Sequence, residues 1–151
     1  MWVRIKERFK GMFSLNESPH RLAASFAVGI FIGICPLLGI HTLLALAVVY
    51  AFRLNMMVTM TGVYVTNPWT IIPIYTFTTW TGAKMLGMNL MDRAFSLSHL
   101  RWNSFLKEFK HLLKPFVVGS TTIGLLAAVF LYFIMYLIFK KVQAKKIQSA
   151  R

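Results

Sequence analysis

Long uncharged stretches dominate the chain. Residues 22–52, 54–83 and 115–139 contain no Lys, Arg, Asp or Glu, and most of their positions are apolar. A helix needs roughly 20 apolar residues to cross about 30 Å of hydrocarbon, so each stretch is long enough to cross a bilayer once. The first stretch begins too late and runs too long for a signal peptide, whose apolar region covers about 7–15 residues. The pattern predicts an all-α, polytopic helical membrane protein.

Helix-breaking residues interrupt the first two stretches near their centres. Pro36 lies inside 22–52, and Asn67-Pro68 lies inside 54–83. Proline removes a backbone donor and clashes with the preceding turn, so each helix is expected to kink or break there. The halves of the first stretch would rise roughly 21 and 24 Å, which is too short to span a bilayer. The sequence therefore predicts two Gly/Pro-broken hydrophobic hairpins, re-entrant in form, or else ordinary kinked spans.

Basic amphipathic segments flank these stretches. Residues 1–15 and 95–113 each combine an apolar helical stripe with Lys and Arg. This pattern is typical of amphipathic surface helices in the headgroup region, although 1–15 is equally compatible with packing on the protein itself. Residues 116–139 predict a C-terminal transmembrane helix, which a basic tail follows. We interpret residues 1–151 as a single membrane domain.

Composition and charge agree with a membrane location. The 151-residue chain is 57% hydrophobic and 14% charged, whereas soluble domains usually carry about 25% charged residues. It has 17 Lys and Arg against 4 Asp and Glu, a net charge of +13. Nucleic-acid-binding proteins carry such charge on polar soluble domains, so we predict no nucleic acid partner and expect anionic membrane lipids instead. We expect the N-terminus and residues 84–114 to lie on the cytoplasmic side.

Residues for catalysis are missing from the apolar stretches. All 4 acidic residues lie outside them: Glu7, Glu17, Asp92 and Glu108. A proton or sodium pump usually needs a carboxylate within the membrane, and a hydrolase needs paired carboxylates, a metal or a nucleophile with its base. Cys35 is the single cysteine, so it has no partner for a disulfide or a metal site. We predict no enzyme activity, no metal and no cofactor.

Several short motifs occur in an order that resembles a known family. They are Ser18-Pro19, Gly29, Gly33, Pro36, Gly39, Thr42, Arg53-Leu54-Asn55, Asn67-Pro68, Thr70, Pro73 and Gly82. Over roughly residues 15–90 the chain resembles the small bacterial membrane proteins of the family called domain of unknown function 2062. The resemblance implies a multi-pass protein of the bacterial inner (cytoplasmic) membrane. Because members are sometimes fused to or encoded near glycosyltransferases and envelope-lipid enzymes, it also implies lipid or glycan-precursor handling.

Polar residues gather around the two breaks and form the predicted substrate-binding site. If both breaks meet at mid-bilayer, half-helix N-termini would favour an anionic group there, and Arg53 at a stretch end would attract it. The candidate residues are Pro36, Gly39, His41, Thr42, Arg53, Asn67, Pro68 and Thr70.

Simpler roles exist for the same side chains. Asn67 is a natural helix cap before proline, His41 can bond a loosened carbonyl, and Arg53 can snorkel to the interface. In the resembling family we expect glutamine at position 41, so His41 makes an uncharged position titratable. Trp concentrates at membrane interfaces. Trp69 therefore fits the prediction in two cases: the second break lies near the bilayer surface, or Trp69 lines the substrate-binding site.

Three functions fit these features. The leading hypothesis is a transporter or translocase for an anionic lipid or lipid-linked envelope precursor, acting as a homo-oligomer because one chain has few crossings. The first alternative is a non-catalytic scaffold that recruits a glycosyltransferase or envelope-lipid enzyme through residues 95–113. The second is an oligomeric ion or solute channel with a positive rim.

Overall fold

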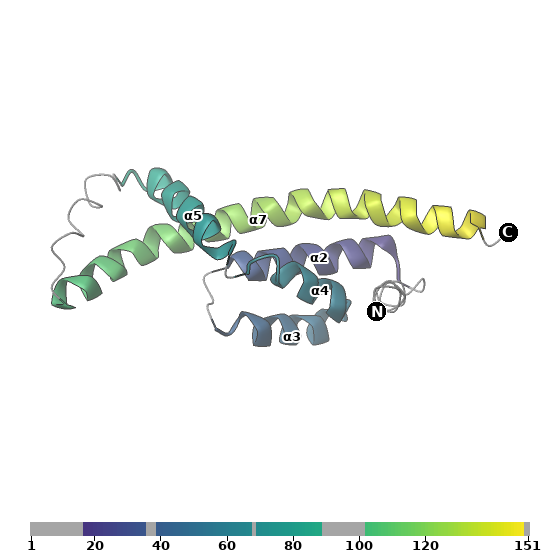
Figure 1. Ribbon diagram of the computed structural model, residues 1–151, viewed down its shortest axis with the longest axis horizontal. Helices are drawn as coiled ribbons and strands as arrows, with labels where there is room; N and C mark the ends of the chain where they lie inside the picture. Colours follow the sequence, from purple (N-terminus) through teal and green to yellow (C-terminus); the bar gives the residue numbers. More distant parts are fainter. Residues whose placement is uncertain (1–16, 36–38, 68, 89–101, 150–151) are drawn as a thin grey trace.

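A computed structural model describes residues 17–35, 39–67, 69–88 and 102–149, and every element in them is helical (Figure 1). The predicted surface helix 1–15, residues 95–101 of the predicted helix 95–113, and both Pro36 and Pro68 lie outside the described residues. The helices are α2 (Pro19–Ile34), α3 (His41–Phe52), α4 (Met56–Val63), α5 (Ile71–Met85) and α7 (Trp102–Ser149).

Both leading stretches are interrupted where the sequence predicts. The first divides into α2 and α3, and the second into α4 and α5. Ser18 caps α2 by accepting a hydrogen bond from the Arg21 amide at 3.3 Å, and Pro19 occupies the first turn, where a missing N–H costs nothing. Asn55 caps α4 in the same way through the Val58 amide. Capping side chains therefore fix the starts of α2 and α4, while proline remains the predicted cause of the interruptions.

Helices α2 and α4 run parallel and in close contact. A Cβ at Gly29 would overlap the carbonyl oxygen of Thr59, and a Cβ at Gly62 would lie 2.6 Å from the carbonyl oxygen of Phe26. One turn further on, a Cβ at Gly33 would lie 2.8 Å from the Val63 carbonyl oxygen. Small residues let the two backbones approach, as in membrane helix pairs.

The long helix α7 organises the other helices. It has 48 residues, about 72 Å at 1.5 Å per residue, and it continues through Pro115. The predicted helix 95–113 and the predicted span 116–139 therefore share one helix over their described parts. Pro115 is buried where Gly82 of α5 crosses α7, and this packing offsets the lost backbone bond. Within the described residues, α7 holds the one segment long and apolar enough to cross a membrane, Leu112–Lys145.

Helix α2 lies antiparallel to α7. Leu22 and Phe139 share a hydrophobic cluster, the Gln143 side chain donates to the Glu17 carbonyl oxygen at 2.8 Å, and Ile34 lies near Gly124. The start of α2 and the end of α7 therefore lie together.

This arrangement separates two segments that we expected to lie on the same side of the membrane. Gly82 of α5 contacts Pro115 of α7, so the residues that follow Gly82, 84–88, lie near Lys114. This end of α7 is opposite to the end that meets the start of α2. The start of α2 and the described residues 84–88 and 102–114 are therefore not at one end of α7. Counting basic residues could not reveal this, because the pairing of α2 with α7 joins segments far apart in the sequence.

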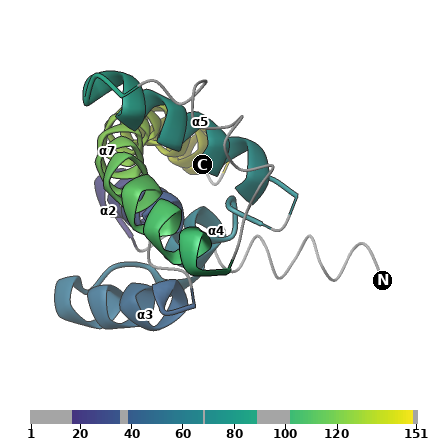
Figure 2. The same ribbon diagram turned by 90° about the vertical axis from the view of Figure 1, so that its left-hand side faces the viewer.

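Helices α3 and α5 leave the α2–α4 pair on opposite sides (Figure 2). Helix α3 packs on α4 and returns toward the start of α2, where the Arg21 guanidinium donates to the carbonyl oxygen of Arg53. Helix α5 instead crosses α7, with Tyr75 and Phe116 rings 4.8 Å apart. The two interrupted stretches thus take different paths after their breaks.

Much of the apolar surface is exposed. Tyr50 on α3 is 81% exposed. In the most apolar 18-residue segment of α7, only 17% of the residues are buried. Soluble monomers rarely expose contiguous apolar patches of this kind, which mark membrane or protein contacts.

Candidate functional site

The second break is a closed polar turn. The Asn67 side-chain oxygen accepts from the Trp69 and Thr70 amides at 2.9 and 3.0 Å. The Thr70 hydroxyl accepts from the Asn67 amide at 2.9 Å and donates to the Val65 carbonyl oxygen at 2.8 Å. Asn67 therefore satisfies amides within the turn, but it does not cap α5, because the residue before that helix is Thr70 and no side chain caps it. The Asn67 side-chain nitrogen donates to no described acceptor and is exposed, as is Trp69 at 90%.

The first break is more open. Gly39 is exposed with φ of +89°, a left-handed conformation that glycine adopts freely, and a Cβ there would meet nothing within 4 Å. Helix α3 then begins after Ile40 with no side-chain cap, and His41 and Thr42 lie half-buried in its first turn. Among the described residues, no side chain accepts a hydrogen bond from the amides of this turn.

The breaks begin side by side but do not converge further. A Cβ at Gly33 would lie 3.1 Å from the Thr66 hydroxyl oxygen, which places the ends of α2 and α4 together. Beyond that point α3 and α5 diverge, and within the described ranges no hydrogen bond joins His41 or Thr42 to Asn67 or Thr70. The predicted residues therefore divide between two neighbouring helix starts.

The first break lies partway along the apolar part of α7. Ile34, the last residue of α2, is near Gly124. At 1.5 Å per residue, Gly124 is about 13 Å along the helix from Pro115 and about 22 Å from Phe139. The break is thus level with the interior of that apolar segment.

Arg53 lies away from both breaks. It ends α3 in a left-handed conformation, with φ of 50°, and its side chain is exposed. Its carbonyl oxygen accepts from Arg21 at the start of α2. Of the predicted site residues in the described part of the chain, Arg53 is thus the one placed at the opposite end of α3.

A polar cluster at that end was not among the predicted site residues. The buried Ser25 hydroxyl accepts from the Asn55 amide at 2.8 Å and donates to the Arg21 carbonyl oxygen at 2.7 Å. The Asn55 side-chain nitrogen donates to a Glu17 carboxylate oxygen at 3.1 Å. The second carboxylate oxygen of Glu17 is buried and has no hydrogen-bond partner among the described residues. We call Glu17, Arg21, Ser25, Asn55 and Gln143 the polar junction, because it joins α2, α4 and α7.

Part of the polar junction has a signal in the sequence. Arg53-Leu54-Asn55 belongs to the motifs that carry the family resemblance, and Asn is a strong helix-capping residue. Gln143 has no such signal, since it is 126 residues from Glu17. In the described ranges no three His, Cys, Asp or Glu side chains gather as metal ligands.

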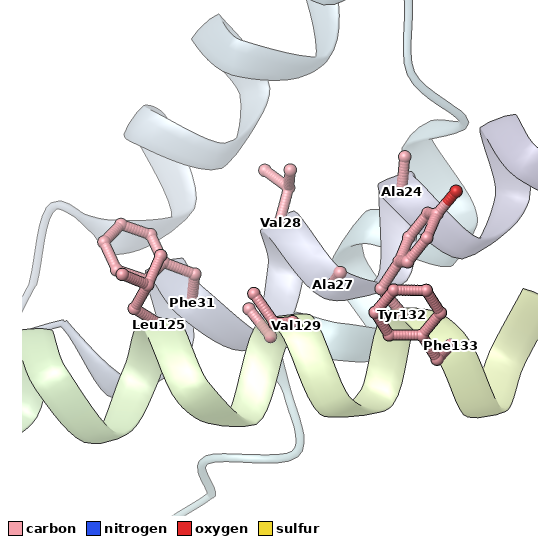
Figure 3. Close-up of a pocket in the computed structure, with 9 residues that line it drawn as sticks. Ala24, Ala27, Val28, Phe31, Leu125, Val129, Tyr132 and Phe133 are labelled. Atoms are coloured by element: carbon pink, nitrogen blue, oxygen red, sulfur yellow. The ribbon is translucent and has the colours of Figure 1, made fainter.

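An open apolar groove of about 450 Å³ runs between α2 and α7 (Figure 3). Its lining side chains are almost entirely hydrocarbon, and the Tyr132 hydroxyl lies toward one end. The groove is lined by Ala24, Ala27, Val28, Phe31, Leu125, Ala128, Val129, Tyr132 and Phe133.

Comparison with known families gives one match. The model of domain of unknown function 2062, described as an uncharacterized protein conserved in bacteria, matches residues 3–148. This match extends well beyond the motifs of residues 15–90. No curated protein and no solved structure matches the chain.

Proposed function

Because the chain belongs to this family of uncharacterized bacterial proteins, we propose that it is a multi-pass inner-membrane protein that moves an anionic lipid or lipid-linked envelope precursor. The helix breaks form its binding site. The observation that carries this proposal is the position of the first break beside Gly124, within the apolar segment of α7.

The exposed apolar surfaces support a bilayer as the surroundings. In this proposal α7 crosses the bilayer once, and α4 and α5 together form a second, interrupted crossing. Helices α2 and α3 form a re-entrant hairpin, which enters the bilayer and returns to the same face. Described basic residues are more numerous at the end that holds the start of α2. By the positive-inside rule that end is cytoplasmic. The basic residues at the end that holds the start of α2 are Arg21, Arg53, Lys140, Lys141, Lys145 and Lys146, against Lys84, Lys107, Lys110 and Lys114 at the other end.

The electrostatics of the breaks favour an anionic group. Helices α3 and α5 both begin without a side-chain cap and without an acidic residue in the first turn. At the start of α3, amides without a described partner and the positive end of the helix dipole attract negative charge, most strongly where water is scarce. At the start of α5 the dipole contributes most of this attraction, because the Ile71 amide donates to the Asn67 carbonyl oxygen and Pro73 has no N–H. His41, Thr42 and the free Asn67 amide group add donors beside these helix starts.

A single chain leaves the second break uncovered. Asn67 and Trp69 are exposed, although irregular backbone within a bilayer is tolerated only against protein or a wet cavity. A second copy of the chain is the occupant that fits, because it would bring an equally exposed break to the same depth. The transporting form is therefore a homo-oligomer.

The site is tested by Asn67→Asp. This change keeps the side-chain oxygen that caps Trp69 and Thr70 and replaces the free amide group with negative charge. In proteoliposomes, transbilayer movement of fluorescent phosphatidylglycerol should fall about tenfold, and zwitterionic phosphatidylcholine should move slowly with or without the change. His41→Ala should cause a smaller loss. The assay is dithionite quenching of the outer leaflet.

Gln148→Glu is the matched control. It adds the same single negative charge as Asn67→Asp, but at an exposed residue near the end of α7. It should move lipid at the unmodified rate. A normal rate for Asn67→Asp would place the site elsewhere, and no movement by the unmodified protein would reject transport.

The homo-oligomer is tested by cross-linking in native membranes. With Cys35→Ser as background, Trp69→Cys should form a disulfide-linked dimer on oxidation, because residue 69 faces the second copy. Phe130→Cys is the control, since Phe130 is 66% exposed on α7 and should face lipid. Dimers at both positions would indicate random collision, and monomers at both would contradict the interface.

The two alternatives give different results in these experiments. A channel would conduct ions across bilayers without moving labelled lipid, and a scaffold would do neither. No described feature favours either one, and residues 95–101 of the scaffold's recruiting segment lie outside the described residues.

A further inference from the structure

We propose that the groove between α2 and α7 holds one hydrocarbon chain of an anionic lipid, with the headgroup beside Lys140. This inference rests on the proposed membrane location and names a second lipid site, distinct from the helix breaks.

The shape of the groove suits a single chain. Its floor contains Ala27 and Ala128, which are only 7% and 8% exposed, so the two helices approach closely there. Phe31 and Tyr132 are bulkier side chains of the lining (Figure 3). The volume of about 450 Å³ lies within the range of small-molecule sites. The groove is therefore narrow, with small side chains between larger ones.

The chemistry of the lining selects hydrocarbon. Apart from the Tyr132 hydroxyl, the lining side chains are aliphatic or phenyl groups, which cannot hydrogen-bond a ligand. A polar ligand placed there would lose its hydrogen bonds without compensation. An acyl or isoprenoid chain loses nothing.

A chain of ring contacts leads from the groove to basic side chains. The Tyr132 ring lies 5.5 Å from the His20 ring and 6.3 Å from the Tyr136 ring. The Lys140 ammonium lies 6.0 Å from the Tyr136 ring, and Lys140 is exposed. Among the described residues at this end, Glu17 is one acidic group against the basic Arg21, Lys140 and Lys141, so the net charge there is positive. Charge complementarity therefore commits the occupant to an anionic headgroup.

The groove is tested in nanodiscs made from equal parts of phosphatidylglycerol and phosphatidylcholine. Lipid that stays with the protein after transfer to mild detergent is measured by mass spectrometry. Ala24→Phe fills the groove from α2 and should lower retained lipid about tenfold, because the chain loses its apolar contacts. Lys140→Gln should leave total lipid unchanged and lower the preference for phosphatidylglycerol about fivefold, the effect of one basic residue near a membrane surface.

Two further variants keep the result interpretable. Leu125→Trp narrows the other end of the groove at a side chain that is 57% exposed, so it should fold and also lower retained lipid. Ala51→Phe adds the same bulk as Ala24→Phe at an exposed position on α3 and should change nothing.

Two outcomes would overturn the proposal. The first is unchanged lipid in both Ala24→Phe and Leu125→Trp. The second is a changed oligomeric state with an unchanged amount of retained lipid, which would mean that a second copy of the chain occupies the groove. Lipid retention is measured without transport, so a failed transport test at the helix breaks would not contradict the groove. A failed retention test at the groove would likewise not contradict the transport site.

Discussion

Gly119→Ala is expected to destabilise the protein by about 3 kcal/mol, the upper part of the range for overpacked sites. At the crossing of α5 and α7, a Cβ at Gly119 would overlap the Thr78 carbonyl oxygen and lie 2.8 Å from the Gly82 amide nitrogen. Both neighbours are backbone atoms, so no side chain can rotate away. The helices must move apart, and the buried Thr78 loses its packing.

Gly124→Ala is the matched control on the same helix. A Cβ there would meet only side-chain atoms of Phe31 and Ile34, at 3.4 to 3.6 Å, which is ordinary contact. It should stabilise the protein by up to about 1 kcal/mol, because alanine favours helix over glycine. Thermal unfolding of the detergent-solubilised protein measures both variants. Equal midpoints for the two would mean that α5 and α7 do not cross at Gly119.

Asn55→Ala is the second variant for which we expect a large effect. It removes the cap of α4, about 1 kcal/mol, and the hydrogen bond that Asn55 donates to Glu17. Leaving a partly buried carboxylate oxygen without its donor costs about 1–3 kcal/mol more. The expected loss of unfolding free energy is about 3 kcal/mol, measured by denaturant titration in mixed micelles.

Two variants separate the contributions at the polar junction. Ser18→Ala removes an exposed cap alone and should cost about 1 kcal/mol. Asn55→Asp keeps the cap but sets a second carboxylate against Glu17, so it should be as destabilising as Asn55→Ala. If Asn55→Asp were as stable as the unmodified protein, the contact with Glu17 would contribute nothing.

The interruptions of the helices could be predicted from the sequence because they depend on local chemistry. Proline and asparagine act on the backbone within one turn, so Asn67 and Thr70 could be placed at a break from their types alone. The continuation of α7 through Pro115 could not be predicted, because it depends on Gly82 from another helix. The family assignment could also be made from short motifs, and the match over residues 3–148 shows it.

The grouping of the polar residues was harder to predict. Ser25 lies in an apolar stretch, and its role depends on Asn55, which is 30 residues further along the chain. Arg53 was assigned to the site because it ends an uncharged stretch. In the structure its carbonyl oxygen joins α3 to α2 at the far end from the breaks.

The pairing of α2 with the end of α7 bears on how the chain is made. Glu17 meets Gln143 only after 126 further residues have been added, so α2 leaves the ribosome long before its main packing surface exists. During synthesis at about 5–20 residues per second, that delay lasts several seconds. Over this interval α2 and α3, each too short to be recognised as a membrane span, have no α7 to hold them. In the proposed membrane arrangement, their insertion must therefore await the last helix or depend on an insertase that shelters incomplete hairpins.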